Sequence, residues 1–391
     1  MASLVDHFRN IYTHIDPSLI LATSSAFALG LIVRGVLQPG KEARIVPSPR
    51  VTLLPGLSEE EQAKLPYPVD SFPGARDVAT PYGSIRVYEF GPESGRKVLL
   101  VHGISTPCLA LGTIANGLAE KGCRVLLFDL FGRGFSDNPV DLPHDLRLFT
   151  TQILLALSSS SLSWTGSGSG KFSIVGYSLG GGIATGFTSY FTNLVDNLVL
   201  IAPAGLIRAH HFSKTNKVLY SEGVIPEPIL LRLVKRRLKK PLSGPRTQPQ
   251  AQDETLSVEE AIQAETNIES NSTAALSQAY PDITIERAVA HQVDNHHGFP
   301  SAFMSSIRYG PIQDQHPLWQ KFGQHLTNTK SKALVVLGRH DGIIHSEELQ
   351  EDAAAVLDNN VEFRVLDAAH DVPIVRGDQI VDHIWSFWNT A

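Results

Sequence analysis

The sequence predicts an α/β protein with a mostly parallel central sheet that is covered by helices on both faces. Three observations support this fold class. From about residue 80 onward, short apolar segments alternate with segments of helical spacing. A Gly-x-Ser-x-Gly run at residues 176–180 lies at one strand-to-helix junction. The alternation stops after Pro203 and resumes near residue 331. Apolar strands that alternate with helices are typical of parallel sheets buried on both faces.

Each expected strand is a short apolar run bounded by glycine, proline or polar residues. The strands are expected at 84–90, 97–101, 123–128, 171–175, 194–201, 333–337 and 361–366. The helices are expected between them, at 108–121, 144–158, 179–191, 346–357 and 373–388.

The 391 residues suffice for one large domain with an insertion, or for two domains. We expect a core in two parts, residues 80–205 and 331–391. Residues 206–330 are expected to form a large lid, inserted between two strands of one sheet, over the edge where ligands bind in open α/β folds. Residues 41–79, rich in proline and polar side chains, are expected to be a linker that wraps the core.

Residues 1–40 are expected to contain an apolar helix. Leu19 to Val33 is apolar or small throughout and ends at Arg34. This run is short for a bilayer, which takes roughly 20 residues. The sequence favours a membrane anchor or an interfacial helix over residues 18–37, and the alternative is a helix packed on the domain or on another subunit. A membrane-associated and a cytoplasmic location both stay open, and the sequence does not indicate an oligomeric state.

Composition excludes several classes of function. A formal net charge of −6 gives no electrostatic case for a nucleic-acid partner. The two cysteines, Cys108 and Cys123, predict no disulfide framework and are expected to be buried thiols. The adjacent pairs His210-His211 and His296-His297 lack a partner cluster, so no metal site is expected.

The run at residues 176–180 proposes Ser178 as a nucleophile. A serine between a strand and a helix occupies a strained turn that exposes its oxygen at the sheet edge. Gly176 and Gly180 are needed there, because side chains would collide with the neighbouring backbone. Tyr177 belongs to the same supporting turn.

A serine nucleophile needs a base, and the base needs a carboxylate that orients it. Asp341 follows the expected strand that ends at Leu337, and His370 follows the one that ends at Leu366. The chain order Ser178, Asp341, His370 matches the order expected of this kind of site. Helix capping is the alternative role for Asp341. Its rivals as the acid, Asp367 and Asp371, are poorly placed to reach the far ring nitrogen.

Two backbone N–H groups are expected to bind the oxyanion. One belongs to Leu179, directly after the nucleophile, and the other to Ile104, after the strand that ends at Val101. Gly103 allows a close approach to the substrate, and His102 is expected to support this loop structurally. Arg133 is expected to be a structural ion-pair partner rather than a substrate ligand.

These pieces together resemble the α/β-hydrolase superfamily, over about 80–205 and 331–390. The matching motifs are Val101-His102-Gly103, Asp129-Leu130-Phe131-Gly132-Arg133-Gly134-Phe135-Ser136, Gly176-Tyr177-Ser178-Leu179-Gly180-Gly181, Gly338-Arg339-His340-Asp341, and His370. The resemblance implies an esterase- or lipase-like serine hydrolase with the triad Ser178, Asp341 and His370. Epoxide hydrolases and haloalkane dehalogenases place aspartate at the nucleophile, so Ser178 argues against both. The lid matches no subfamily.

The sequence therefore predicts a hydrolase that acts on a carboxylic ester or related acyl substrate through an acyl-enzyme, without a cofactor or a metal. The lid and the apolar N-terminal segment favour an apolar small-molecule substrate. Thioesters, lactones, C–C bonds, peptides and acyl transfer stay open within the same fold. The alternative from another class is a non-catalytic ligand receptor on this fold.

Overall fold

The computed structural model describes residues 16–37, 44–166, 168–208, 211, 225–238, 275–277 and 280–390. The chain divides into two units, Met1–Arg44 and Ile45–Ala391, and the central sheet lies in the second.

The first unit contains the helix α2 (Pro17–Leu37), where the sequence predicts an apolar helix. Asp16 lies before this helix, and its carboxylate accepts hydrogen bonds from the backbone and the hydroxyl of Ser18. The side chains from Ser18 to Gly30 are all exposed, including large apolar ones such as Leu21 and Phe27. In the described part of the chain, no helix is both long enough and apolar enough to cross a lipid bilayer.

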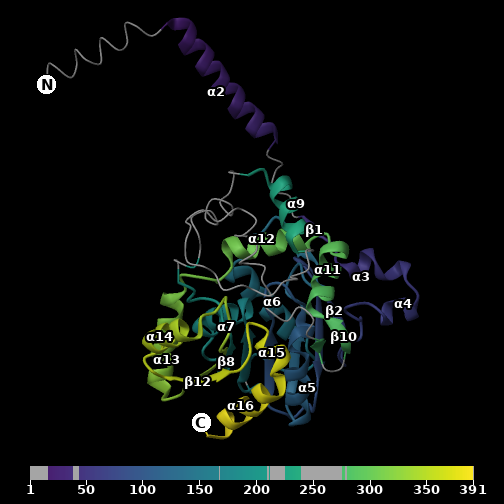
Figure 1. Ribbon diagram of the computed structural model, residues 1–391, viewed down its shortest axis with the longest axis vertical. Coiled ribbons are helices and arrows are strands. Elements are labelled where there is room, and N and C mark those ends of the chain that lie inside the picture. The colour runs from purple at the N-terminus through teal and green to yellow at the C-terminus, as the bar shows by residue number, and fades with distance from the viewer. Residues whose placement is uncertain are drawn as a thin grey trace, which may run out of the picture. The chain divides into compact units, whose positions relative to one another are not determined.

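The second unit, whose helices and strands are drawn in Figure 1, is built on an eight-stranded sheet. The strand order is β12-β11-β8-β7-β4-β5-β3-β2. Strand β3 pairs with β2 and with β5 in antiparallel fashion, and the other five pairs are parallel. The strands are β2 (Arg76–Thr80), β3 (Gly83–Phe90), β4 (Lys97–Val101), β5 (Arg124–Phe128), β7 (Phe172–Tyr177), β8 (Val195–Ile201), β11 (Ala333–Gly338) and β12 (Val361–Leu366). The predicted mostly parallel sheet is confirmed. The central strands are fully buried, as their continuous apolar sequences require.

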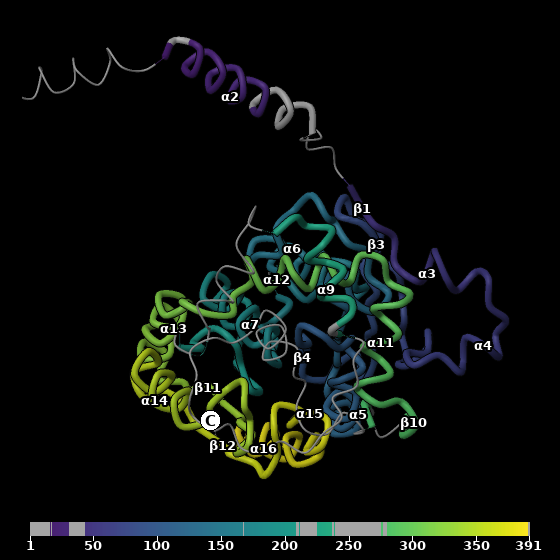
Figure 2. The backbone as a smooth tube through the Cα atoms, turned by 45° about the horizontal axis from the view of Figure 1, so that its top comes forward, coloured from purple at the N-terminus to yellow at the C-terminus, as the bar shows by residue number. Residues whose placement is uncertain are grey.

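Helices cover both faces of this sheet (Figure 2). One group packs together through α5 (Gly112–Glu120), α15 (Val372–Val375) and α16 (Gly377–Thr390). The other group packs through α6 (Leu146–Ser158), α7 (Leu179–Tyr190), α13 (His316–Thr329) and α14 (Ser346–Val356). The single C-terminal helix expected at 373–388 is therefore two helices. A 3-10 turn, η2 (Cys108–Leu111), occupies the first part of the helix expected at 108–121.

The segment 41–79 is more than a linker. It contributes the edge strand β2, which pairs with β3, and β1 (Ile45–Val46), which pairs with β6 (Asn138–Pro139). Three short helical elements follow β1: α3 (Pro49–Thr52), η1 (Leu54–Gly56) and α4 (Glu59–Ala63). Strand β2 alternates between half-buried and exposed side chains, so it lacks the continuous apolar run that marks the central strands.

Part of the segment 206–330, which the sequence predicts to be a lid, belongs to the core. The hydroxyl of Ser189 on α7 donates to the carbonyl oxygen of Leu318 on α13, and Phe322 and Leu326 are buried, so α13 belongs to the helical layer of the core. The other described elements of this segment are α9 (Glu227–Leu238), β9 (Ala275–Ser277), β10 (Tyr280–Thr284), α11 (Ile285–Asn295) and α12 (Phe299–Tyr309). We call α11 and α12 the lid helices, after the lid that the sequence predicts for this segment.

The parallel strands bring three distant loops to one edge of the sheet. Strands β7, β11 and β12 end at Tyr177, Gly338 and Leu366. The residues that follow these strands are those in which the sequence predicts catalytic side chains. Ligand sites of open α/β sheets lie outside this carboxyl edge.

Candidate active site

Ser178 occupies the sharp turn between β7 and α7. Its backbone has φ 53° and ψ −122°, a conformation that costs a residue other than glycine about 1–3 kcal/mol. Four backbone hydrogen bonds hold it. Its N–H donates to Ile201 at 3.0 Å, and its carbonyl oxygen accepts from Gly181 at 2.8 Å, Ala204 at 3.0 Å and Gly182 at 3.4 Å. The surrounding backbone therefore fixes the strained turn.

The glycines beside Ser178 are required by close backbone packing. A Cβ atom at Gly176 would lie 2.3 Å from the carbonyl oxygen of Gly180. A Cβ atom at Gly180 would lie 2.2 Å from the carbonyl oxygen of Val101. Both distances are too short for any side chain, so the strand β7, the helix α7 and the end of β4 can only approach this closely with glycine at both positions.

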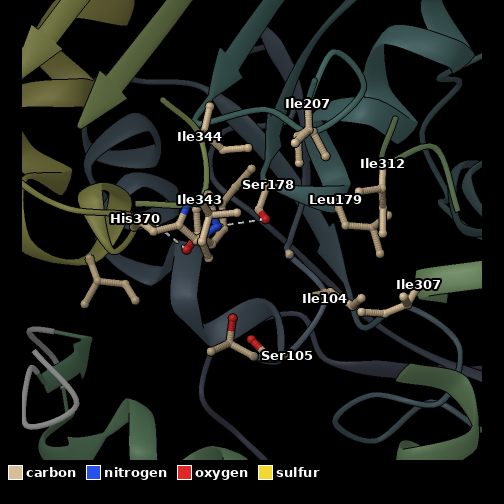
Figure 3. A pocket seen from close by; sticks show the side chains of 15 residues that line it. Ile104, Ser105, Ser178, Leu179, Ile207, Ile307, Ile312, Ile343, Ile344 and His370 are labelled. Atoms are coloured by element: carbon tan, nitrogen blue, oxygen red, sulfur yellow. Dashed lines mark hydrogen bonds between the residues drawn. The ribbon is translucent and has the colours of Figure 1, made fainter. Parts of the chain in front are cut away.

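His370 and Asp341 line up behind Ser178, as Figure 3 shows for His370. His370 Nε2 lies 3.0 Å from Ser178 Oγ, and His370 Nδ1 lies 2.8 Å from Asp341 Oδ2. The histidine and the aspartate are both buried. The structure thus brings Ser178, His370 and Asp341 together in one hydrogen-bonded chain, in the order that the sequence predicts. Such a chain is the arrangement in which a histidine can act as the base for a serine.

The second oxygen of Asp341 is engaged by its own loop. Asp341 Oδ1 accepts from the N–H groups of Ile343 at 2.9 Å and Ile344 at 2.8 Å. The carboxylate therefore stabilises a local turn, but it does not cap α14, which begins at Ser346. The rival Asp367 lies 2.9 Å from His340 Nε2 instead, on the surface.

The two N–H groups that the sequence predicts as oxyanion donors lie near Ser178 and are not used by the described fold. In the described part of the chain, the N–H groups of Ile104 and Leu179 have no hydrogen-bond acceptor. A Cβ atom at Gly103 would lie 3.3 Å from Ser178 Cβ, so the Ile104 loop passes close to the nucleophile. Both groups are available to bind a negatively charged oxygen.

His102 is buried and supports the loop. Its Nε2 accepts from the N–H of Leu130 at 2.8 Å, so the ring proton lies on Nδ1, which faces the carbonyl oxygen of Gly103 at 2.8 Å. Burial, helped by the charge of Arg133, lowers the pKa of His102 to about 3. The ring is therefore neutral at ordinary pH.

Arg133 is structural but makes no ion pair within the described residues, contrary to the expectation. Its fully buried guanidinium donates to the carbonyl oxygens of Ile104 at 3.0 Å and Phe131 at 2.9 Å, and to Ser306 Oγ at 2.8 Å. Burial lowers its pKa to about 9. The short-range motif at residues 129–136 gave no signal that its partner on α12 would be a serine 173 residues away.

An apolar cavity opens beside Ser178, with about 690 Å³ of empty space including its mouth. Its walls could not be predicted from the sequence, because they come from separate strand-end loops and from the segment 206–330. Ser105 and Thr106 supply its polar hydroxyls. Isoleucine is its commonest side chain: Ile104, Ile207, Ile307, Ile312, Ile343, Ile344 and Ile374 (Figure 3).

The cysteines and the paired histidines lie in other settings. Both Cys108 and Cys123 are buried and free, as predicted. His210 falls outside the described residues, whereas His211 lies 2.8 Å from Glu348. His296 is buried, and its Nε2 lies 2.8 Å from the carbonyl oxygen of Ser136. Across the described ranges, no three histidine, cysteine or acidic side chains gather closely enough to hold a metal ion.

Comparison with known proteins identifies the fold family of this chain. A sequence model of the alpha/beta hydrolase fold family matches residues 97–376. A serine hydrolase-like protein of Dictyostelium discoideum is 28% identical over 144 residues, which are 35% of this chain and 38% of that protein. An uncharacterized protein of Mycobacterium bovis is 31% identical over 140 residues, which are 34% of this chain and again only 38% of the relative's length.

Solved structures show the same fold at low identity. The enol-lactonase from Burkholderia xenovorans superposes with a TM-score of 0.53 at 16% identity, over 80% of this chain and all of that one (100%). The family match covers well over half of the 391 residues. The chain therefore belongs to the α/β-hydrolase fold family.

Proposed function

We propose that this chain is a serine hydrolase that cleaves a carboxylic ester with an apolar acyl group. The observation that carries the proposal is the continuous hydrogen-bonded chain from Ser178 through His370 to Asp341, at the mouth of an apolar cavity. A hydroxyl is a poor nucleophile unless a base removes its proton, and this alignment supplies such a base.

Acylation follows from the alignment. His370 Nε2 accepts the proton of Ser178 Oγ while that oxygen forms a bond to the ester carbonyl carbon. Asp341 then stabilises the imidazolium through its bond to Nδ1. When the tetrahedral intermediate collapses, the bond to the alkoxy oxygen breaks, and His370 gives that oxygen the proton. Water attacks the acyl-enzyme by the same route and releases the acid and Ser178.

The oxyanion of each intermediate is proposed to bind the N–H groups of Ile104 and Leu179. Loss of one such donor typically costs about 2.7–4 kcal/mol of transition-state stabilisation. Leu179 begins α7, so the partial positive charge of the helix N-terminus adds to its own donor.

The cavity walls indicate an apolar substrate on both sides of the scissile bond. The leaving group must lie next to His370, where Ile343, Ile344 and Ile374 line the cavity. The acyl group then points toward the remaining wall, where Ile207, Ile307 and Ile312 lie. Each methylene buried there contributes about 0.8 kcal/mol of binding free energy, so medium-length acyl chains are favoured over acetyl.

Two measurements test this function. A fluorophosphonate probe should label the wild type and leave Ser178→Ala unlabelled, and equal labelling of the two would refute the assignment of the nucleophile. Turnover of p-nitrophenyl esters should rise from acetyl to octanoyl through a lower KM. Tight binding of an ester without any turnover would favour the non-catalytic receptor instead.

We also propose that α2 associates with a lipid surface. The exposed apolar side chains of Leu19, Leu21, Phe27 and Leu29 support this, since they would gain burial in the interfacial region of a bilayer. Wild type should co-float with phosphatidylcholine vesicles, and a variant with Leu21→Asp and Phe27→Asp should not. Equal flotation of the two proteins would exclude this role for α2.

A further inference from the structure

Three consecutive carbonyl oxygens of the loop His102–Thr106, the oxyanion loop, face buried polar side chains. The oxygen of Gly103 faces His102 Nδ1 at 2.8 Å. The oxygen of Ile104 accepts from Arg133 Nε at 3.0 Å, and that of Ser105 accepts from Gln292 Nε2 at 2.8 Å. A surface loop would give these carbonyls to water, so this one is held from behind by the protein.

The two longer side chains reach the loop from beyond it and tie it to the lid helices. Gln292 is buried on α11, and its Oε1 also accepts from the N–H of Gly134 at 2.9 Å. Arg133 Nη2 donates at 2.8 Å to Ser306 Oγ on α12. Each of these side chains therefore joins three parts of the protein: the oxyanion loop, the loop that follows β5, and a lid helix.

Because a peptide group is planar, a contact that fixes its carbonyl oxygen also fixes the direction of its N–H group. The chain has no cis peptide bond among the described residues, so each N–H points away from the carbonyl oxygen of the residue before it. The carbonyl of Gly103 faces the protein through His102, which turns the N–H of Ile104 the opposite way. The hydrogen bonds to the carbonyl oxygens of Ile104 and Ser105 restrain the backbone that follows this N–H. The donor is therefore held from both sides along the chain.

The charge of Arg133 suits a site where negative charge develops. Within the described residues it has no carboxylate partner, and burial of such a cation is costly. Its field contributes to the lowered pKa of His102 in the same loop. The positive charge of Arg133 disfavours a protonated His102 in this loop. The same charge favours a negatively charged oxygen at the oxyanion site.

We propose that Arg133 and Gln292 are positioning residues for the oxyanion donor of Ile104, and that through them the packing of α11 and α12 sets the geometry of the oxyanion site. Neither side chain lines the cavity, so neither touches the substrate. This inference rests on the proposed hydrolase function, and it predicts a defect in the tetrahedral intermediate rather than in substrate binding.

The test compares Gln292→Met, Arg133→Lys and Ser306→Ala with wild type, in the full chain. Methionine keeps the length of glutamine without its donor, lysine keeps the charge without the fork, and the serine variant removes only the contact with α12. Ser301→Ala is the matched control, because Ser301 lies in the first turn of the same helix and contacts Gly298 and Asn138 instead. Steady-state kinetics on a p-nitrophenyl ester and inhibition by a trifluoromethyl ketone, whose adduct with Ser178 carries an oxyanion, are measured at equal folded concentration.

For Gln292→Met and Arg133→Lys we expect kcat to fall about tenfold or more, with KM within threefold, since small misplacements of catalytic groups have effects of this size. The affinity for the ketone should fall by about the same factor. Ser306→Ala should show the same pattern at a few-fold, and Ser301→Ala should equal wild type.

Two results would overturn the positioning role. One is a folded Gln292→Met or Arg133→Lys protein with kcat and ketone affinity within twofold of wild type. The other is a loss confined to KM. Both presuppose that wild type turns over the ester, whereas a wild type that neither hydrolyses esters nor reacts with the fluorophosphonate would refute the proposed function and this inference together. If Arg133→Lys does not fold, Gln292→Met and Ser306→Ala decide the question.

Discussion

The hydroxyl of Tyr177 donates a hydrogen bond of 3.0 Å to the backbone carbonyl oxygen of His370. Tyr177 directly precedes the candidate nucleophile, and its ring centroid lies 5.4 Å from that of His370. The same ring lies against Gly103, where a Cβ atom would come within 3.2 Å of it. One buried side chain thus contacts both the loop of the base and the loop of the oxyanion donor.

Tyr177→Phe should therefore lower kcat by about three- to tenfold, because a net hydrogen bond is worth about 0.5–1.5 kcal/mol and this one fixes the loop of the base. KM should change little, since the ring that lines the cavity is kept. Steady-state kinetics on a p-nitrophenyl ester check this. An unchanged kcat would show that the remaining contacts of the His370 loop are sufficient to hold it.

Asp341→Asn should lower kcat by about 10⁴-fold while leaving the fold intact, because an amide cannot hold the imidazole in the required tautomer or stabilise its charge. The rate of fluorophosphonate labelling at Ser178 should fall in parallel. Asp367→Asn is the control, since that carboxylate pairs with His340 on the surface, and it should stay within twofold of wild type. Equal losses in the two variants would reopen the choice of acid.

That Ser178, Asp341 and His370 lie together could be predicted from the sequence, because each position is local to a strand end. Ser178, Asp341 and His370 each follow an apolar run, and parallel strands place such positions at one edge. The edge strand β2 could not be predicted in this way, because its half-exposed side chains carry no continuous apolar signal. The helix α13 lies after a long segment without alternation, so its place in the core was also missed.

The partners of Arg133 and Gln292 illustrate a different limit. Arg133 was identified from a short motif, but its acceptors are backbone carbonyls and a serine hydroxyl, which any sequence contains in large numbers. Gln292 lies 187 residues from the carbonyl of Ser105 that it holds. A contact between a common side chain and a distant backbone group has no sequence signature. Only the folded arrangement of the lid helices reveals it.

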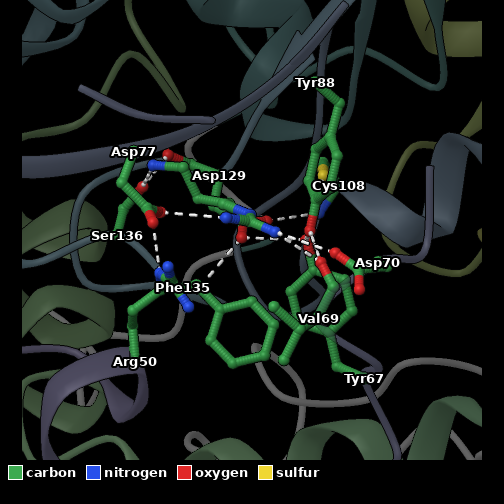
Figure 4. Close-up of polar contacts among 11 residues, drawn as sticks. Arg50, Tyr67, Val69, Asp70, Asp77, Tyr88, Cys108, Asp129, Phe135 and Ser136 are labelled. Carbon is green, nitrogen blue, oxygen red and sulfur yellow. Dashed lines mark hydrogen bonds and ion pairs between the residues drawn. The ribbon is translucent and has the colours of Figure 1, made fainter. Parts of the chain in front are cut away.

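Tyr67 anchors the segment before β2 to the core (Figure 4). Its buried hydroxyl donates to Asp129 Oδ2 at 2.9 Å and lies 3.0 Å from the hydroxyl of Tyr88. Asp129 is fully buried, and burial raises the pKa of its carboxyl. Tyr67→Phe should therefore lower the free energy of unfolding by about 1–3 kcal/mol, the usual cost when a buried group loses its partner.

Urea denaturation of Tyr67→Phe against wild type measures this loss. Tyr82→Phe is the control, because in the described structure the hydroxyl of Tyr82 makes no hydrogen bond, and its stability should match that of wild type. The kcat of folded Tyr67→Phe should equal that of wild type, since the site lies elsewhere. Equal stability of the two variants would mean that Tyr67 does not anchor the segment.

Two buried histidines should make the protein sensitive to acid. Burial lowers the pKa of His102 to about 3 and that of His296 to about 4, against about 6.5 for a histidine in an unfolded chain. Below pH 6.5 the unfolded chain binds protons at these positions and the folded protein does not. The free energy of unfolding therefore falls as the pH drops from 6.5 toward 4, by about 2 kcal/mol for each histidine at pH 5.

Urea midpoints at pH 7.5 and pH 5 measure this fall. His296→Gln should flatten it, because that variant has one group fewer to protonate on unfolding. A His296→Gln protein as sensitive to acid as wild type would show that His296 is not held neutral in the fold.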